Sequence, residues 1–458
     1  MSFQKAIQPY LGTREFYKKL LLISLPLALQ QLLSSAMGIV DTMLVAKIGQ
    51  VTAVGTAAQI DTMAITVAFG AASGAAIFMT QFYGAKDTSR LRKSFGLGLL
   101  MTTFIALVFA LAAFFFSGPL LRFYINDANV LSSASDYLSV ALYGYIPTIL
   151  MMTFSFAYRS VHKTHIPLLI GTAAMALKIG LSYLLIFGLF GLPVMGVRGA
   201  AFGTLIAQTL GLLTYIVYSY RTNQQFMGKL KEMFGFTRNF IQVILRRSSP
   251  LIFNETMFAI GSTLYIVIFG RLGSQAMESY YVAVQIGNLF LFLIQGISTA
   301  NAAILGAELG SGDLKRAKQT GNAFISVAVI FSLVLSINVL LTAQPLVSMF
   351  GLEDPFVISQ AILIVRVFAV RLSLRLFNVI IFASLRAGGD SKFLAFLDSG
   401  ILWLVGLPTA FFFVSILHIQ SIALVFLLVQ VEQLVRVVVG LKRYFAGTWI
   451  RNLTLEIT

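Results

Sequence analysis

Twelve long apolar blocks constrain the fold of this chain more than any other feature of its sequence. Each block runs for about 20 to 30 residues, and only 11% of all residues are charged. A helix of that length crosses a hydrocarbon core of about 30 Å, and the blocks lack the alternation of barrel strands. The predicted spans are roughly 17–46, 52–83, 94–117, 130–158, 167–189, 199–220, 243–270, 276–307, 320–343, 356–386, 393–417 and 419–441. We therefore expect an all-α membrane protein with twelve transmembrane helices.

The distribution of basic residues predicts the orientation of the chain. The net charge is +16, but with a cytoplasmic N-terminus 24 of the 33 Lys and Arg residues lie in inner segments and four in outer loops. This is the positive-inside pattern. We therefore expect a multi-pass protein of the cell (inner) membrane with both termini cytoplasmic, contacts with membrane lipids, and no nucleic-acid partner.

The two halves of the chain repeat one another. Four pairs of blocks align in the same order at an offset of 224 to 227 residues: 24–49 with 249–273, 57–60 with 283–286, 83–96 with 309–321, and 156–167 with 382–393. Because each half holds six predicted helices, both enter the membrane from the same side, as parallel repeats related by an axis along the membrane normal. We therefore predict two six-helix bundles, an N-lobe of residues 1–220 and a C-lobe of residues 248–458. A cytoplasmic linker, 221–247, is expected to lie along the membrane face.

The residue types of the chain argue against an enzyme, a cofactor or a metal site. There is no cysteine, and the three histidines are His162, His165 and His418. Their spacing does not form a metal-ligand cluster, and no nucleophile accompanies a candidate base. We expect no catalytic residue, no resident cofactor and no bound metal.

Asp41 is a carboxylate inside the first predicted span. Such a group costs at least about 2.5–3.5 kcal/mol near the centre of a bilayer. At about 100° per residue, Gln30 and Ser34 fall on the same helix face as Asp41, and Met37 lies close to it. This polar stripe must face protein or water. Two interpretations stay open, a proton or cation site in an N-lobe cavity and a structural ion pair.

An ordered set of motifs resembles one transporter family. The set comprises "VDTMLVAKIG", "GAKDTSRLRK" with its repeat "GSGDLKRAKQ", "SYLLIFGLFGLPVMGVRGAAFGTLIAQ", and "SLRAGGDSKF" followed by "DSGILWLVGLPTAFFF". It is similar to the multidrug and toxic compound extrusion (MATE) family of the wider MOP flippase superfamily. The resemblance implies an N-lobe and a C-lobe with a cleft between them. It also implies export of small molecules, driven by inward H⁺ or Na⁺ movement.

The resemblance also implies roles for particular residues. Asp41, in "VDT", matches the coupling residue of the family's N-lobe. Glu255 stands where NorM-like members have a glutamate of a C-lobe cation site, and Asn254 flanks it. Coupling is therefore expected at Asp41 and Glu255, with Asn254 in the C-lobe cavity.

The tenth predicted span departs from the family pattern. NorM-like members have an aspartate eleven residues before the arginine of the "LR-G" stretch, where this chain has Arg375, and Arg371 lies one turn away. Buried charges need partners, so one interpretation pairs Glu255 with Arg375 or Arg371. The other is that these arginines bind an anionic group of the substrate.

The fifth predicted span departs as well. Family members often have Asn and then Asp where this chain has Lys178 and Ser182. A lysine in mid-membrane needs a partner, and the same lobe holds Asp41. We predict that Lys178 pairs with Asp41 in the N-lobe cavity, directly or through one water.

Two functions fit these features. The leading hypothesis is a monomeric MATE-type antiporter that exports organic, amphipathic compounds by alternating access. The alternative is a lipid- or oligosaccharide-linked flippase of the same superfamily, whose basic cavity would hold an anionic head group.

Overall fold

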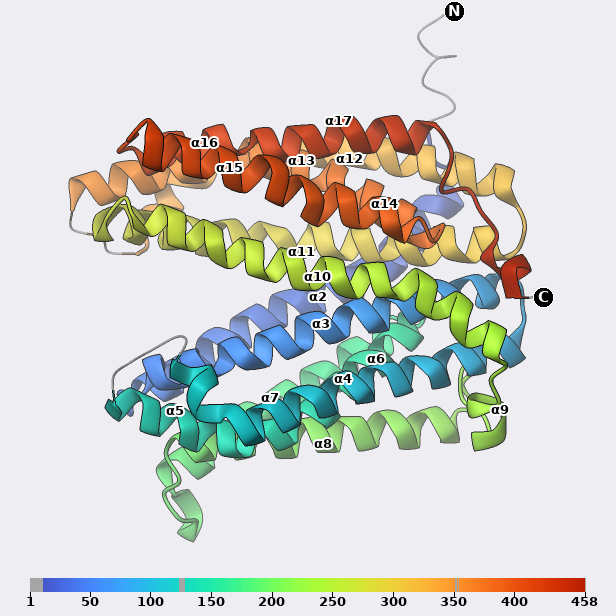
Figure 1. Ribbon diagram of the computed structural model, residues 1–458, viewed down its shortest axis with the longest axis horizontal. Helices are drawn as coiled ribbons and strands as arrows, with labels where there is room; N and C mark the ends of the chain where they lie inside the picture. The colour runs from blue at the N-terminus through green and yellow to red at the C-terminus, as the bar shows by residue number, and fades with distance from the viewer. Residues whose placement is uncertain (1–10, 123–127, 351, 353, 458) are drawn as a thin grey trace, which may run out of the picture. The chain divides into compact units, whose positions relative to one another are not determined.

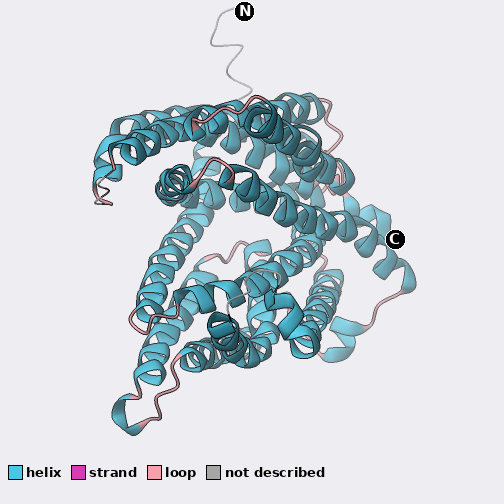
Figure 2. Ribbon diagram, turned by 60° about the vertical axis from the view of Figure 1, so that its left-hand side comes forward, coloured by secondary structure: helices cyan, strands magenta, loops and turns pink. Residues whose placement is uncertain are grey.

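The chain folds into long helices joined by short connections (Figures 1 and 2). The computed structural model describes residues 11–122, 128–350, 352 and 354–457. Within these residues twelve helical spans are long and apolar enough to cross a membrane. Each begins and ends within six residues of its predicted bounds. The prediction of an all-α membrane protein with twelve such helices is confirmed.

The spans of the first half are mostly single helices. They are α2 (Arg14–Ala46), α3 (Val51–Gly84), α4 (Thr88–Arg122), α5 (Ala128–Ala141) continued by α6 (Tyr145–Ser160), α7 (His165–Phe187) and α8 (Val197–Arg221). The short 3₁₀ turn Leu142–Gly144 joins α5 to α6 within one span.

The second half follows the same order. Its spans are α10 (Arg238–Gly270), α11 (Ser274–Gly310), α12 (Leu314–Ser348), α13 (Pro355–Ala387), α14 (Ser391–Ala395) with α15 (Leu407–Phe411), and α16 (Ile422–Val429) with α17 (Val431–Phe445). Three π-helical segments interrupt the eleventh span.

Corresponding residues of the two halves shape the chain in the same way. Pro26 lies inside α2 and Pro250 inside α10, where a proline removes one backbone hydrogen bond and favours a kink. The Asp87 carboxylate accepts from the backbone N–H of Arg90 at 2.9 Å, and the Asp313 carboxylate accepts from that of Arg316 at 3.0 Å. Both aspartates therefore cap the start of the third helix of their half.

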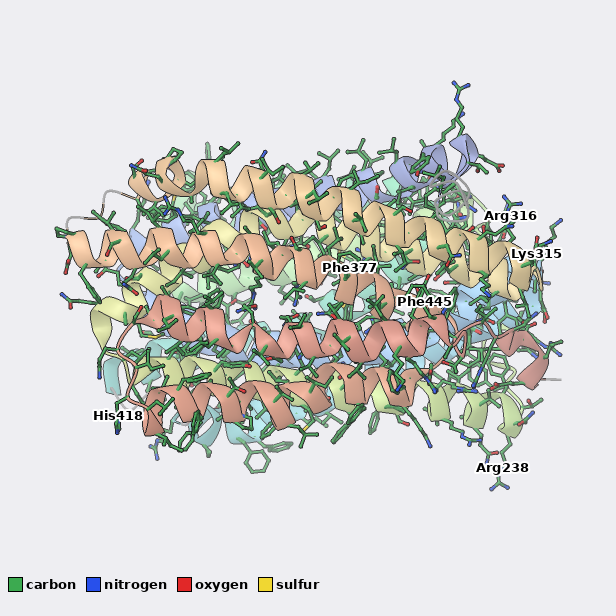
Figure 3. The ribbon with its side chains drawn as sticks, turned by 90° about the horizontal axis from the view of Figure 1, so that it is seen from above. Arg238, Lys315, Arg316, Phe377, His418 and Phe445 are labelled. Carbon is green, nitrogen blue, oxygen red and sulfur yellow. The ribbon has the colours of Figure 1, made fainter. Side chains whose placement is uncertain are left out.

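Contacts divide the chain into two compact units. Residues 29–252 form the first unit, and residues 253–456 together with the start of α2 up to Ala28 form the second. Small buried residues of α3 such as Ala57, Ala64 and Ala68 let neighbouring helices of the first unit approach closely. In the second unit Lys315 and Arg316 lie at one end and His418 at the opposite end (Figure 3).

The predicted linker is partly helical. It holds the short helix α9 (Leu230–Phe234), which is tied to α4 by a 2.7 Å ion pair between Arg92 and Glu232. Its last residues, 238–247, form the first turns of α10 instead of a separate element. The Thr237 hydroxyl accepts from the backbone N–H of Phe240 and so starts this helix early. The lobe bounds and the orientation of the linker along a membrane stay predictions.

Candidate functional site

An ion pair joins α2 to α7 inside the first unit. Lys178 Nζ lies 2.8 Å from Asp41 Oδ2, and the two side chains are only 25% and 27% exposed. The predicted direct contact between these residues is confirmed. Asp41 Oδ1 is buried and has no hydrogen-bond partner within the described part of the chain. The carboxylate therefore keeps one oxygen free to accept a further donor.

The ion pair lines a cavity of about 480 Å³ within the first unit. Asp61 of α3, Tyr137 of α5 and Tyr145 at the start of α6 lie in the same wall as Asp41 and Lys178. The remaining lining is mostly small or aliphatic. Ligand pockets are commonly apolar with a few polar groups, and this cavity has that character.

Asp61 is a second carboxylate in this cavity, and the sequence pattern did not place it there. The Tyr145 hydroxyl donates to Asp61 Oδ1 at 2.8 Å. Asp61 forms no ion pair within the described residues, and the Tyr145 hydroxyl that donates to it is neutral. The cavity thus holds two carboxylates and one ammonium. A signal was present, since Asp61 is the only acidic residue between 52 and 83.

The other residues predicted for the first cavity lie outside its lining. Gln30 Oε1 accepts from Arg159 Nη2 at 3.4 Å, and the Ser34 hydroxyl donates to the carbonyl of Gln30 at 2.8 Å. Ser182 is fully buried where α7 meets Gly203 of α8, a glycine whose missing Cβ gives the hydroxyl its room. Met37 is not part of the lining either. The face of α2 that carries Gln30, Ser34 and Asp41 is polar, as predicted. Only Asp41 of these three lines the cavity, whereas Gln30 contacts Arg159 of α6 and Ser34 bonds to the backbone of α2.

Glu255 of α10 pairs with Arg386, at the end of α13. Arg386 Nη2 lies 3.2 Å from Glu255 Oε1. The expected pairing of Glu255 with Arg375 or Arg371 is therefore wrong. Arg375 precedes Arg386 by eleven residues, which is about 16 Å along a helix. The two arginines therefore lie at different depths along α13. The first unit has the corresponding contact between Gln30 and Arg159.

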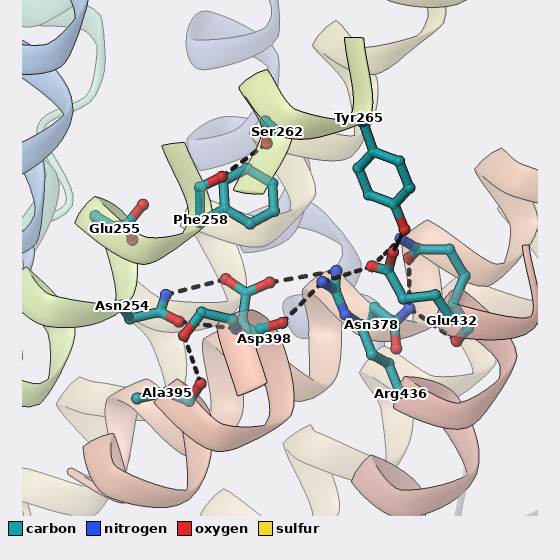
Figure 4. A network of polar contacts seen from close by, with 12 residues as sticks. Asn254, Glu255, Phe258, Ser262, Tyr265, Asn378, Ala395, Asp398, Glu432 and Arg436 are labelled. Atoms are coloured by element: carbon teal, nitrogen blue, oxygen red, sulfur yellow. Dashed lines mark hydrogen bonds and ion pairs between the residues drawn. The ribbon is translucent and has the colours of Figure 1, made fainter. Parts of the chain in front are cut away.

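A buried network occupies the interior of the second unit (Figure 4). Arg436 of α17 is 1% exposed and pairs with Glu432 at 2.6 Å and with Asp398 at 3.3 Å. Asn254, predicted to line a cavity, is fully buried, and its Nδ2 donates to Asp398 Oδ2 at 3.0 Å. The Tyr265 hydroxyl donates to Glu432. One guanidinium thus serves two carboxylates, and their remaining oxygens receive neutral donors.

Arg371 and Arg375 of α13 take no part in these ion pairs. The guanidinium of Arg371 lies over the rings of Phe368 and Phe426, at 5.6 and 5.2 Å from their centroids. Arg375 is partly buried and lies within electrostatic range of Asp398 and of Arg371. Among the described residues, no group of three or more His, Cys, Asp or Glu side chains could hold a metal ion.

Comparisons with known proteins agree with this arrangement. The family model MatE matches residues 26–184 and 250–412. A probable multidrug resistance protein NorM of Thermotoga maritima is 24% identical, over 88% of this chain and 86% of its own. The multidrug resistance protein MdtK of Yersinia pseudotuberculosis is 23% identical, over 86% of this chain and 87% of its own.

Solved structures share the fold. The Vibrio cholerae MATE transporter VcmN in its bent form superposes with a TM-score of 0.84 at 17% identity, over 97% of this chain and 99% of its own. A MOP superfamily transporter from Pyrococcus furiosus gives a TM-score of 0.84 at 18% identity, over 98% and 99% of the two chains. For that second structure, the reverse polarity of its binding pocket is described as suggesting a different function.

Proposed function

Because this chain belongs to the MatE family, we propose that it is a secondary active efflux transporter of the inner membrane. The chain is an integral, multi-pass membrane transporter that acts on small molecules, and it is not an enzyme. In our proposal it works as a monomer with both termini cytoplasmic. It exports organic, amphipathic compounds by alternating access, in exchange for inward H⁺ or Na⁺.

The observation that carries this proposal is the Asp41–Lys178 ion pair in the wall of the first cavity. The Lys178 ammonium occupies one carboxylate oxygen of Asp41, so an incoming proton or cation has to compete with it for that carboxylate. Coupling therefore requires the pair to open in one state of the cycle. Asp41 then takes the incoming ion while Lys178 is free, and closing the pair expels the ion on the other side.

The same pair favours H⁺ over Na⁺ as the coupling ion. A sodium ion at Asp41 would need several oxygen ligands, and the Lys178 ammonium, which lines the same cavity, would repel it even after the pair has opened. A proton needs one oxygen, and Asp41 Oδ1 has no partner among the described residues. We propose a second coupling position at Glu255, whose pair with Arg386 would have to open in the same way.

Reconstitution tests the proposal. Proteoliposomes are loaded with an anionic dye, carboxyfluorescein, or a cationic dye, rhodamine 6G, and an imposed pH or Na⁺ gradient should accelerate export of at least one. Asp41→Asn should reduce the gradient-driven rate about tenfold or more. Asp136→Asn is the matched control, because Asp136 pairs with Arg198 at the surface of the same unit, where ion pairs contribute little. Export unaffected by either gradient would contradict the proposal.

One observation favours the alternative function. Arg371 and Arg375 give the second unit cationic groups that form no ion pair with the described residues, of the kind that an anionic lipid head group would need. The Pyrococcus furiosus structure, described as having reversed pocket polarity, is a precedent within the superfamily. A flippase would move fluorescently labelled phosphatidylglycerol between leaflets without a requirement for either gradient.

A further inference from the structure

Two arginines lie in the middle of a membrane-spanning helix. Arg371 is the central residue of α13, sixteen residues from Pro355 and sixteen from Ala387, which is about 24 Å from either end. Arg375 lies one turn further along. Charged residues at such depth are costly, and they face the bundle interior or a polar cavity.

The nearby carboxylates are already occupied. Glu255 pairs with Arg386, and Asp398 and Glu432 pair with Arg436. Within the residues that the structure describes, neither Arg371 nor Arg375 forms an ion pair. A structural role would normally give each buried guanidinium an acceptor, as the Gln30 amide does for Arg159 in the first unit. Among the described residues, Arg371 and Arg375 have no such acceptor.

The charges of this region leave a positive excess. Arg436 carries one charge against the two of Asp398 and Glu432, and Arg375 lies within electrostatic range of all three. Adding Arg375 balances them, and Arg371 then stands in excess. Positive charges four residues apart on a helix repel each other. An anion between the two guanidiniums would remove both the excess and the repulsion.

Aromatic rings lie close to the guanidinium of Arg371. The Arg371 guanidinium lies over Phe368 and Phe426, whose ring centroids are 5.3 Å apart. The ring of Tyr280 packs edge-on against Phe426 at 5.9 Å. Cation–π contacts hold a guanidinium in place without neutralising it. Arg371 is therefore fixed in position while its charge stays available to a ligand that can also contact apolar rings.

We propose that Arg371 and Arg375 form an anion-binding site that takes the carboxylate, sulfonate or phosphate group of an aromatic small molecule. Guanidinium groups bind such anions through two parallel hydrogen bonds. The inference rests on the proposed function only in naming this ligand as a transported compound. Binding to the purified protein needs no ion gradient, so the two proposals fail separately.

Equilibrium binding tests the site. The anisotropy of carboxyfluorescein is titrated with the purified full-length protein in detergent, and rhodamine 6G, which has the same ring system but a positive charge, is the control ligand. The double variant Arg371→Gln/Arg375→Gln should bind carboxyfluorescein about tenfold more weakly or worse. Arg366→Gln removes an exposed charge from the same helix and should leave its affinity unchanged.

The melting temperature separates a binding role from a structural one. If the arginines bind a ligand, Arg371→Gln alone, which removes the charge that stands in excess, should leave the melting temperature unchanged or raise it. Arg375→Lys keeps the charge and should retain part of the affinity. Equal carboxyfluorescein affinity in wild type and double variant, or an equal loss in Arg366→Gln, would overturn the proposal.

A competition experiment on the wild-type protein covers the case of a variant that does not fold. Benzenesulfonate should displace carboxyfluorescein, whereas benzyl alcohol, which has the ring without the charge, should not. Displacement by both would mean apolar binding and would overturn the proposal. Displacement by dioctanoyl-phosphatidylglycerol would support the anion site and assign a lipid head group as its source.

Discussion

The interior of the first unit holds two carboxylates and one ammonium in a single cavity, whereas the interior of the second holds three guanidiniums around two carboxylates. The first set has a negative excess and the second a positive one. An excess carboxylate can take up a proton, and an excess guanidinium can hold an anion but cannot titrate in the physiological range. The difference favours the Asp41 cavity as the main coupling position and the arginines of the second unit as the place where an anionic ligand binds.

The two units share the contacts that cap their helices and that join one helix to another. The capping aspartates Asp87 and Asp313 are retained, and Arg159 and Arg386 both reach back to the first helix of their half. The residues that differ face the interior, where Lys178 has no basic counterpart at this offset. A repeated fold thus keeps its capping and packing while the two interiors acquire opposite charge.

The largest effect should come from breaking the buried network of the second unit. Arg436→Met keeps most of the volume but leaves Asp398 and Glu432 without their cation. Removing one partner of a buried ion pair costs about 3–5 kcal/mol, so denaturant unfolding in mixed micelles should show a loss of that size. Arg366→Met, on an exposed position, should change the free energy of unfolding by less than about 0.5 kcal/mol. A similarly small loss for Arg436→Met would mean that Arg375 replaces it.

A smaller effect is expected from Lys178→Ala in the first unit. The pair is about one quarter exposed to its cavity, so the orphaned carboxylate should cost about 1–3 kcal/mol. The same change removes the group that competes with an incoming ion for Asp41, so export should depend more steeply on the pH gradient. The double variant Lys178→Ala/Asp41→Asn should recover much of the stability. If the stability losses of the two single variants simply add up in the double variant, the two residues are not coupled.

The smallest effect concerns Asp61. Tyr145→Phe removes its one hydrogen bond from a neutral donor, for an expected loss of about 1 kcal/mol. Because Asp61 has no cationic partner among the described residues, we expect Asp61→Asn to shift the pH dependence of export. A pH profile identical to that of wild type would restrict coupling in this cavity to Asp41.

Most of the fold could be predicted because the thickness of a bilayer sets the length of long apolar blocks and because the two halves of the sequence repeat. The pairing of Lys178 with Asp41 could also be predicted, since one lobe offers few partners for two buried charges. The repeat itself contained a further signal. Gln30 and Arg159 correspond to Asn254 and Arg386, so the Gln30–Arg159 contact, once known from the structure, places Arg386 beside Asn254 and its neighbour Glu255.

Other parts of the site could not be read from the chain. The position of Asp61 in the cavity depends on how α3 rotates against α5 and α6, which helical periodicity alone does not determine. The burial of Ser182 depends on the close approach of α8 at Gly203. The two partners of Arg436 come from different helices, so only the local pair with Glu432 has a sequence signature.

The most direct test of the division between the two units measures carboxyfluorescein export by proteoliposomes over a range of dye concentrations, with and without a pH gradient. Asp41→Asn should remove the stimulation by the gradient. Arg371→Gln/Arg375→Gln should raise KM for the dye about tenfold or more, and a gradient should still accelerate its export. Stimulation of Asp41→Asn equal to that of wild type, or an arginine variant that loses stimulation without a change in KM, would contradict the account.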